Sequence, residues 1–337
     1  MPAEWEPHAA TWFSWPRPEG ISFPDQYKIV LPVYAALIKQ LVSVEEVNIN
    51  VWNREMESEA RQLLLKEKTP LERVRFHYFP AYEPWCRDHG PIFLVRDQNG
   101  KHERAVVDWG YNAWGGKYPP FDLDDAIPQH VATLRDLPLF SPEIILEGGS
   151  IEVNGHGTLL TTESCLLNKN RNPHLSKSDI EKYLSDYLGV RNILWLGEGI
   201  IGDDTDGHID DLSRFVNSTT IVTVVEKNSA DEDFSILQEN LKRLRTLRDQ
   251  DGNLFRIVEL PMPGVIEHQG QRLPASYANF YIANQLVLVP TYRHQNDKIA
   301  VEILQKEFPD RRVVGIDSTD LIWGLGSFHC LSQQEPA

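Results

Sequence analysis

Residues 178–188 read SDIEKYLSDYL, and after three further residues the run NILWL occupies positions 192–196. The apolar periodicity of the first stretch predicts a helix over 177–188, and the second stretch is a short apolar strand. Ser178-Asp179-Ile180-Glu181 has the spacing of a capping box at the helix start, with Ser178 as the N-cap. The stretch therefore predicts one helix leading directly into one buried strand.

The same helix-then-strand order recurs along the chain. Helical periodicity appears near 26–42, 54–68, 233–247 and 297–308. These helices lead into strand-like runs at Val47–Val51, Val74–Phe79, Leu254–Leu260 and Arg312–Ile316. Further runs of strand type lie at Pro91–Val95, Ala105–Trp109, Ile144–Leu146, Gly157–Thr161, Thr219–Val225 and Gln285–Pro290.

This pattern predicts a mixed α/β fold that forms one domain over residues 1–337, because no Gly/Ser linker or low-complexity tract interrupts it. A recurring unit also suggests a ring of small sheets. The units are unevenly spaced, however, and share no residue-level repeat. The pattern alone therefore leaves the arrangement of the repeats open.

The composition is that of a soluble globular protein, with 41% hydrophobic and 24% charged residues. No apolar run approaches the roughly 18 residues that a membrane span requires, so we expect no membrane association. The N-terminus lacks the features of a signal peptide. The three cysteines, Cys86, Cys165 and Cys330, are widely spaced and indicate neither a disulfide framework nor a zinc motif. A reducing cytoplasm is the expected location.

The formal net charge of −16 argues against a nucleic-acid partner, whose binding depends on clustered Lys and Arg. A negative field also raises the local concentration of cationic ligands. The same charge could serve solubility alone, so it favours a cationic ligand only weakly.

Four short segments place polar or reactive side chains beside turn-forming glycines or prolines. They are Trp85–Pro91, Glu147–Ser150, Asp206–Asp211 and Gly324–Cys330. Reactive groups held on rigid turns at strand ends are a common way to build a site. Taken one at a time, each segment could equally be an ordinary turn with surface acids, which is the usual situation for carboxylates.

His208 and Asp210 are two residues apart and would point to the same face of an extended strand. A calcium loop is excluded, because aligning Gly207 with the glycine of such a loop puts Gly202 and Ser213 at the outer ligand positions. No second His or Cys stands at the spacing of a zinc site with His208. We therefore expect no metal and no organic cofactor.

Cys330 follows a glycine-containing loop, and its neighbour is His329. A lone cysteine is usually a small buried hydrophobe. Here Gly324 and Gly326 would let the backbone approach a ligand closely, which favours a nucleophilic role. Only a few per cent of a thiol with a pKa of about 8.5 is ionised at pH 7, so a nearby positive charge is needed, either a histidine or a cationic substrate. Cys86 is a weaker candidate.

Considered together and in this order, the segments resemble the agmatine deiminase family of guanidine-modifying enzymes, which also includes arginine and peptidylarginine deiminases. The resemblance covers essentially the whole chain. It rests on Pro2-Ala3-Glu4-Trp5, Thr11-Trp12, Arg87-Asp88-His89-Gly90-Pro91, Asn112-Ala113-Trp114-Gly115-Gly116, Glu147-Gly148-Gly149-Ser150, Asp206-Gly207-His208-Ile209-Asp210, His329-Cys330 and Gln333-Gln334.

The resemblance implies a five-bladed pseudo-symmetric α/β propeller (a pentein) of repeated ββαβ units, with the site on its axis. It implies hydrolysis of agmatine to N-carbamoylputrescine and ammonia, a step towards putrescine, through a covalent thiouronium on Cys330. The implied roles are Cys330 as nucleophile, His208 as acid and base, and Asp88, Glu147 and Asp210 as the carboxylates of the site. A homodimer is common among such relatives.

Some details depart from the family pattern or stay open. His89 stands where threonine is common, and Leu325, Ser327 and Phe328 replace the more usual Gly, Asn and Ile, which puts selectivity for the substrate's tail in doubt. Trp85 and Trp114 lie beside site motifs and could stack on a cation, or could be core aromatics. The competing readings are a deiminase of another guanidine such as peptidyl-arginine, a Cys–His amidase, and a polyamine-binding module without catalysis.

Overall fold

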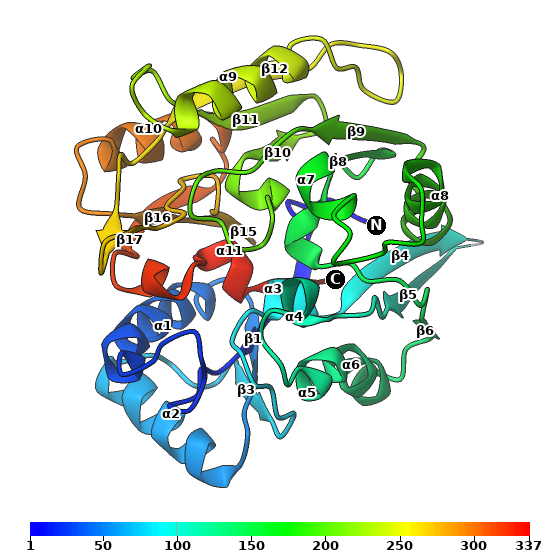
Figure 1. The fold of residues 1–337 in the computed structure, drawn as a ribbon. Coiled ribbons are helices and arrows are strands. Elements are labelled where there is room, and N and C mark those ends of the chain that lie inside the picture. The colour runs from blue at the N-terminus through cyan, green and yellow to red at the C-terminus, as the bar shows by residue number, and fades with distance from the viewer. Residues whose placement is uncertain (99) are drawn as a thin grey trace.

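The strands within the described residues form five sheets of three or four strands and one two-stranded hairpin (Figure 1). The structure is a computed structural model, and it describes residues 1–98 and 100–337. The first sheet contains, in spatial order, β18 (Gln333–Pro336), β1 (His8–Ser14), β2 (Glu46–Asn50) and β3 (Val74–His77). Strand β18 pairs antiparallel with β1, so the two ends of the described chain meet in one sheet.

The other four sheets share a single plan, in which an antiparallel pair of strands is followed by a helical segment and a third strand parallel to the second. These sheets are β4 (Ile92–Gln98), β5 (Lys101–Val107) and β6 (Leu139–Phe140); β7 (Glu152–Val153), β8 (Thr158–Thr162) and β9 (Asn192–Leu196); β10 (Ser213–Asn217), β11 (Thr220–Val225) and β12 (Arg256–Pro261); and β15 (Tyr281–Ala283), β16 (Leu286–Thr291) and β17 (Arg312–Asp317). The hairpin consists of β13 (Glu267–His268) and β14 (Gln271–Arg272). The first sheet follows the same plan, with β18 as its antiparallel strand.

Helices of nine or more residues link the strands of these sheets. They are α1 (Tyr27–Leu41), α2 (Arg54–Lys66), α6 (Ile127–Arg135), α8 (Lys177–Leu188), α9 (Asp233–Leu244) and α10 (Asp297–Glu307). The shorter helical segments are α3 (Cys86–His89), α4 (Ala113–Gly116), α5 (Asp122–Asp125), α7 (Glu163–Leu166), α11 (Phe328–Leu331) and the 3-10 turns η1 (Gly148–Ser150), η2 (Ile209–Asp211) and η3 (Leu321–Gly324).

Helix α8 shows how the sequence determines these elements. Ile180, Leu184 and Leu188 lie on one face and are buried in a shared core cluster. Full burial of each such side chain stabilises the fold by roughly 1.5–3 kcal/mol. The capping box is formed by Ser176 with Asp179, so the prediction that Ser178 is the N-cap was wrong. The helix itself and the strand that follows it are confirmed.

The predicted helices and most of the predicted strands are present, with ends that shift by a few residues. Residues 144–146 are an exception, because Ile145 makes only an isolated bridge to Gly110 and no strand forms there. Sequence reasoning also missed β1 and β18. Among the described residues, no helix is both long enough and apolar enough to cross a bilayer.

Four short segments position the reactive side chains. The helix α3 packs against α11 and η1, and η1 packs against η2. Figure 1 shows α3 and α11 close to the middle of the molecule, with the longer helices towards its outside. The fold therefore brings together residues that are far apart in sequence, such as Arg87, whose Nε donates a hydrogen bond to the backbone carbonyl of His329, 242 positions away.

Candidate active site

The five residues expected to carry chemistry all lie in or beside these four segments. Asp88 is in α3, Glu147 precedes η1, His208 precedes η2, Asp210 is within η2, and Cys330 is in α11. Asp88 and Cys330 are 5% and 6% exposed, and the other three are fully buried. A set of ionisable groups with so little exposure is characteristic of functional sites, where burial shifts pKa values.

Gly149 marks the point where three of these groups converge. A Cβ atom built on Gly149 would lie 2.5 Å from Nδ1 of His208, 2.7 Å from Oδ1 of Asp88 and 3.1 Å from Oδ2 of Asp210. No side chain could occupy that position without displacing the site. His208 Nδ1 and Asp88 Oδ1 are themselves 3.6 Å apart.

His208 and Asp210 do not share a strand, so the expectation that an extended strand aligns them was wrong. His208 has extended backbone, but it is the N-cap of the 3-10 turn that contains Asp210. The turn nevertheless brings both side chains close to Gly149. Their proximity therefore comes from a tight turn packed on η1 rather than from strand periodicity.

Asp88 is held through both of its oxygens. Its Oδ2 accepts a hydrogen bond from the indole nitrogen of Trp114 at 2.9 Å, and its Oδ1 accepts one from the backbone N–H of Gly149 at 3.0 Å. Burial raises the pKa of Asp88 to about 6, against the opposing effect of His208. Asp88 is therefore fixed in place and becomes fully anionic only above mildly acidic pH.

Trp114 reaches Asp88 from a strained turn. The residues Ala113, Trp114, Gly115 and Gly116 all have positive φ, at 52°, 56°, 91° and 78°. Left-handed conformations cost a non-glycine residue roughly 1–2 kcal/mol. The two non-glycine residues of this turn thus carry strain where the indole N–H meets the Asp88 carboxylate, as is common at functional sites.

Asp210 has one committed oxygen and one free oxygen. Its Oδ2 accepts a hydrogen bond from Nδ1 of His329 at 2.6 Å. Its Oδ1 is buried and has no partner among residues 1–98 and 100–337. Burial alone would raise the pKa of this carboxyl, but the hydrogen bond and charge of His329, together with His208 and Arg214, hold it below the usual value. Asp210 is therefore an anion with one acceptor oxygen free.

The sulfur of Cys330 lies among acids and one amide. It is 3.7 Å from Oδ2 of Asp210 and 3.0 Å from the side-chain nitrogen of Asn279. Burial, followed by the fields of Asp210, Asp211 and Asp88, raises the pKa of this thiol well above its usual value. In the free protein Cys330 is a neutral thiol, and only an added positive charge would make it a thiolate near pH 7.

His208 carries the positive charge of the site. Burial would lower its pKa, but Asp88, Cys165 and Glu147 together raise it well above the usual value. Neither of its ring nitrogens has a hydrogen-bond partner within the described part of the chain. An imidazolium with uncommitted N–H groups is suited to donating a proton.

Glu147 faces His208, but its firmest partner is Arg171. One side-chain atom each of Glu147, Cys165 and His208 (a carboxylate oxygen, the sulfur and a ring nitrogen) lie within 4.8 Å of one another. Oε1 of Glu147 accepts a hydrogen bond from Arg171 Nε at 2.7 Å, whereas Oε2 has no partner among the described residues. Glu147 thus adds negative charge beside His208 without a hydrogen bond to it, and Arg171 fixes its position.

The same groups are the ones with the spacing to hold a metal ion. One set is Glu147, Cys165 and His208, and a second is Asp210, Asp211 and Cys330. A metal ligand must be deprotonated. The raised pKa values of His208 and of the Cys330 thiol oppose that state in each set, so these residues fit proton transfer better than metal binding.

A cavity of about 260 Å³ reaches the site from the surface, and Cys330 and Asp88 line it. Trp85 and Trp114 also line the cavity, so the structure places both tryptophans where a ligand could touch them. Other lining residues come from the 21–26 loop, the β13–β14 hairpin, residues 204–205 and residues 323–326. The lining is rich in aromatic side chains and includes the buried carboxylate of Asp88, which suits a cation.

Gly324 and Gly326 both line the cavity, so the prediction that their backbone approaches a ligand closely stays a prediction. The two glycines also have a packing role. A Cβ atom on Gly326 would lie 2.5 Å from the ring of Trp85, and one on Gly324 would lie 2.5 Å from the ring of Phe23. These glycines therefore make room for aromatic side chains that form the cavity wall.

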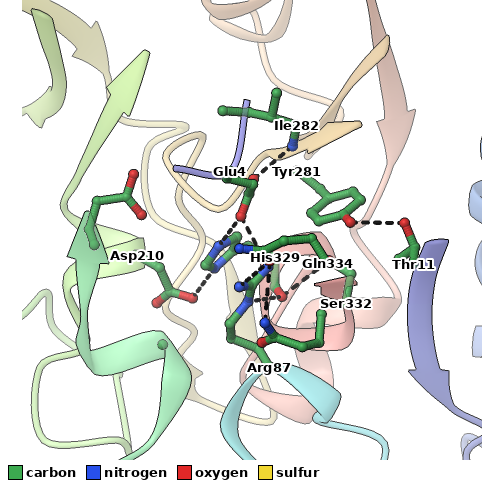
Figure 2. Close-up of polar contacts among 12 residues, drawn as sticks. Glu4, Thr11, Arg87, Asp210, Tyr281, Ile282, His329, Ser332 and Gln334 are labelled. Atoms are coloured by element: carbon green, nitrogen blue, oxygen red, sulfur yellow. Dashed lines mark hydrogen bonds and ion pairs between the residues drawn. The ribbon is translucent and has the colours of Figure 1, made fainter. Parts of the chain in front are cut away.

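Sequence reasoning missed the buried residues that support the site. Figure 2 shows Glu4 and Arg87 beside the ring of His329, with Asp210 at the other ring nitrogen. Asn279 accepts a hydrogen bond from the backbone N–H of His329 at 3.0 Å and donates one to the Cys330 sulfur. Glu4 and His329 lay inside quoted motifs, which was the one available signal, whereas Asn279 lay in no recognised motif.

Comparisons with known proteins point in one direction. Residues 1–336 match the family described as Porphyromonas-type peptidyl-arginine deiminase. The chain is 35% identical over 367 residues to the agmatine deiminase of Medicago truncatula, covering 100% of this chain and 96% of that protein.

Solved structures agree with this match. The structure of an agmatine deiminase of Enterococcus faecalis, described as catalysing its reaction, has a TM-score of 0.92 and 33% identity, covering 100% of this chain and 95% of that one. A cysteine-to-serine variant of the C. jejuni agmatine deiminase with substrate bound has a TM-score of 0.90 and 30% identity, covering 100% and 96%.

Proposed function

Because the chain belongs to the Porphyromonas-type peptidyl-arginine deiminase family, we propose that it hydrolyses agmatine to N-carbamoylputrescine and ammonia, a step towards putrescine. Full-length similarity to agmatine deiminases supports this substrate. The observation that carries the proposal is the position of the Cys330 sulfur, 3.7 Å from Asp210 at the inner end of a cavity that Asp88 also lines.

The acidic inner end of the cavity matches a guanidinium group. A guanidinium stays protonated at any working pH, is planar, and presents its N–H groups in a fixed fork that suits carboxylates. Asp88 and the free Oδ1 of Asp210 are the acceptors for that fork. Each charge-assisted hydrogen bond contributes roughly 1.5–3 kcal/mol. Two carboxylates would therefore anchor the group and fix its carbon beside Cys330.

Substrate binding itself would generate the nucleophile. The Cys330 thiol is neutral in the free protein, because burial and the surrounding acids raise its pKa. An entering guanidinium cation offsets the field of Asp88 and Asp210, so the thiol can lose its proton to solvent. Placing the reacting carbon against the sulfur supplies up to roughly 7–11 kcal/mol of the barrier.

The chemistry then proceeds in two halves. The Cys330 thiolate attacks the guanidinium carbon, and the imidazolium of His208 gives its proton to the departing nitrogen, which leaves as ammonia. The product of this half is an S-alkylthiouronium on Cys330. The now neutral His208 takes a proton from water, which attacks the same carbon and releases the carbamoyl product and the thiol. Asp88 and Glu147 favour the charged form of His208, in which the cycle begins and to which the second half returns it.

We also propose that the five sheets are the blades of a five-bladed propeller with pseudo-fivefold symmetry. The shared strand plan of the sheets supports this arrangement, as does the pairing of β18 with β1, which would close the ring. The site would then lie on the axis, where α3 and α11 meet. No step of the proposed chemistry depends on the ring being closed.

Product analysis tests the function directly. Incubation with agmatine should give N-carbamoylputrescine by mass spectrometry and one equivalent of ammonia. A blocked arginine peptide serves as the comparison substrate, because its bulky backbone would have to enter a cavity of about 260 Å³. Turnover of the peptide without turnover of agmatine would assign the chain to the other activity of its family. Absence of both products would refute deimination.

A further inference from the structure

We propose that Glu4 and His329 are positioning residues, which hold one oxygen of Asp210 from behind and leave its other oxygen free for the substrate's guanidinium. The inference rests on the proposed function, because it assigns Asp210 to the substrate. His329 contacts one oxygen of Asp210 and Glu4 contacts the far nitrogen of His329, so both would act through Asp210 rather than by touching the ligand.

The ring of His329 bridges two carboxylates (Figure 2). Its Nδ1 is 2.6 Å from Oδ2 of Asp210, and its Nε2 is 2.8 Å from Oε2 of Glu4. A neutral imidazole has a single N–H, so it can donate to only one of two ionised carboxylates. An imidazolium can donate to both. The geometry therefore favours a charged His329 between two anions.

Glu4 is fully supplied with hydrogen-bond donors despite being buried. Its Oε2 accepts from Arg87 Nη2 at 3.0 Å and from His329, and its Oε1 accepts from Arg214 Nη2 at 3.0 Å and from the N–H of Ile282 at 2.8 Å. Burial would raise the pKa of Glu4, but these cations hold it well below the usual value. Glu4 is thus a permanent anion behind His329.

The same chain of contacts fixes the direction of Asp210. With Oδ2 bound to His329, the carboxylate can rotate little, and Oδ1 remains the unpartnered atom among the described residues. The two oxygens are chemically equivalent, so whichever one accepts the 2.6 Å hydrogen bond from His329, the other is left for the ligand. A buried acceptor without a hydrogen bond destabilises the fold, so Oδ1 is suited to accept a hydrogen bond from a bound ligand.

Other charges also face Asp210, and they set the background against which His329 acts. They come from Asp88 in α3, Asp203 and His208 before η2, Asp211 in η2, Cys330 in α11 and Arg214 in β10. His329 contributes both the hydrogen bond and the largest charge effect that lowers the pKa of Asp210. Removing His329 should therefore raise that pKa more than the loss of the more distant Arg214.

Three substitutions test the inference. His329→Ala removes both the bond to Asp210 and the charge, whereas His329→Asn keeps an amide N–H near the former Nδ1 and removes the charge and the contact with Glu4. Glu4→Gln removes the anion behind the ring. Glu45→Gln is the matched control, because Glu45 is a buried carboxylate whose partners are His8, Thr11 and the backbone N–H of Asn284. It removes a buried carboxylate that has no hydrogen bond to His329, Asp210 or Arg214 among the described residues.

The first readout needs no turnover. In protein labelled with γ-¹³C aspartate, the Asp210 signal is assigned by its absence in Asp210→Asn, and its titration is followed by NMR. The loss of a charge-assisted bond should raise the midpoint by about one pH unit or more in His329→Ala. We expect a smaller rise in His329→Asn and in Glu4→Gln, and none in Glu45→Gln.

The second readout is the separation of KM from kcat for agmatine. We expect KM to rise about tenfold in His329→Ala at pH 8 and the deficit in kcat/KM to grow as the pH falls, with partial recovery in His329→Asn. An unchanged Asp210 midpoint together with an unchanged KM in His329→Ala would overturn the inference, as would losses no larger than those of Glu45→Gln. Failure of the wild-type protein to turn over agmatine would refute the function, while the NMR titration would still decide the positioning role.

Discussion

The side-chain nitrogen of Asn279 lies 3.0 Å from the sulfur of Cys330, while the oxygen of the same amide accepts the backbone N–H of His329. One side chain thus fixes both the nucleophile and the first turn of the short helix that carries it. The nitrogen also donates to Oδ1 of Asp211 at 3.0 Å, which holds the amide in one orientation.

Replacing Asn279 with Ala should therefore lower kcat more than it raises KM. Losing a hydrogen bond of this kind costs about 1–3 kcal/mol, which corresponds to roughly a ten- to hundredfold loss in rate. Steady-state kinetics with agmatine measure the effect. Asn284→Ala is the control, because the hydrogen bonds of Asn284 join it to the backbone of His8 and to Glu45 rather than to Cys330. Equal losses in both variants would contradict a role at Cys330.

Cys330→Ala should abolish ammonia release and leave the melting temperature nearly unchanged, because the thiol makes weak contacts and the cavity beside it is already open. Cys86→Ala is the matched control. Cys86 is fully buried, and burial raises the pKa of its thiol to about 12, so it cannot serve as a nucleophile near neutral pH. We expect Cys86→Ala to lose some stability and keep its turnover. Ammonia release at the wild-type rate by Cys330→Ala would refute the assignment.

Alkylation of Cys330 should depend on the charge of the reagent. Burial and the nearby acids raise the pKa of this thiol in the free protein well above the usual value, so the thiolate fraction stays small near neutral pH and grows only in alkaline solution. Iodoacetamide, which is neutral, should therefore react slowly at pH 7 and faster in strong alkali. A cationic haloacetamidine should label Cys330 readily at pH 7, because its charge stabilises the thiolate. Equal rates for both reagents at pH 7, measured by mass spectrometry, would contradict this picture.

Acid should weaken substrate binding through Asp88. Its pKa is raised to about 6, so the carboxylate is neutral below that pH, and kcat/KM should fall as the pH drops through about 6. The Trp114 hydrogen bond lowers this pKa, so Trp114→Phe should move the acidic limb to higher pH. Trp109→Phe is the control, because the indole nitrogen of Trp109 has no partner within the described residues. If the acidic fall in kcat/KM occurs at the same pH in Trp114→Phe and Trp109→Phe, Trp114 does not have this role.

Gly326→Ala should damage substrate binding by moving Trp85. The added Cβ would lie 2.5 Å from the Trp85 ring, and overpacking of this kind costs typically 1–3 kcal/mol. We expect a lower melting temperature and a higher KM for agmatine. Gly189→Ala is the control, because a Cβ there meets open space and only its positive φ is unfavourable. If Gly326→Ala leaves KM unchanged, the Trp85 wall does not contact substrate.

The sequence allowed prediction of elements whose stability is local. Helix α8 and strand β9 follow from apolar spacing and turn residues within 20 positions of each other. Strand β1 escaped notice because Thr11 and Ser14 are polar yet fully buried, and its partner β18 lies more than 300 positions away. Pairing at such separation leaves no local periodic signal.

The reactive residues were recognisable, whereas their supports were not. Cys330, His208 and Asp210 stand in short motifs with turn glycines, so their chemistry could be proposed before their geometry. The supporting contacts join segments that are distant in sequence, such as Glu4 with His329 and Asn279 with Cys330. An acid or amide buried by folding looks like any surface acid or amide in the sequence, because burial is a property of the assembled chain.

Because α11 and β18 are neighbours in sequence, the reactive cysteine and the last strand of the first sheet are made almost together during synthesis. The sulfur donor at 330 and the strand that completes the first sheet are separated by only two residues. A chain whose synthesis stops before this point lacks both the sulfur of Cys330 and β18, the edge strand that pairs with β1. Such a fragment exposes an unsatisfied sheet edge. Incomplete synthesis should therefore yield material that is inert and marked for proteolysis, and no partially active enzyme.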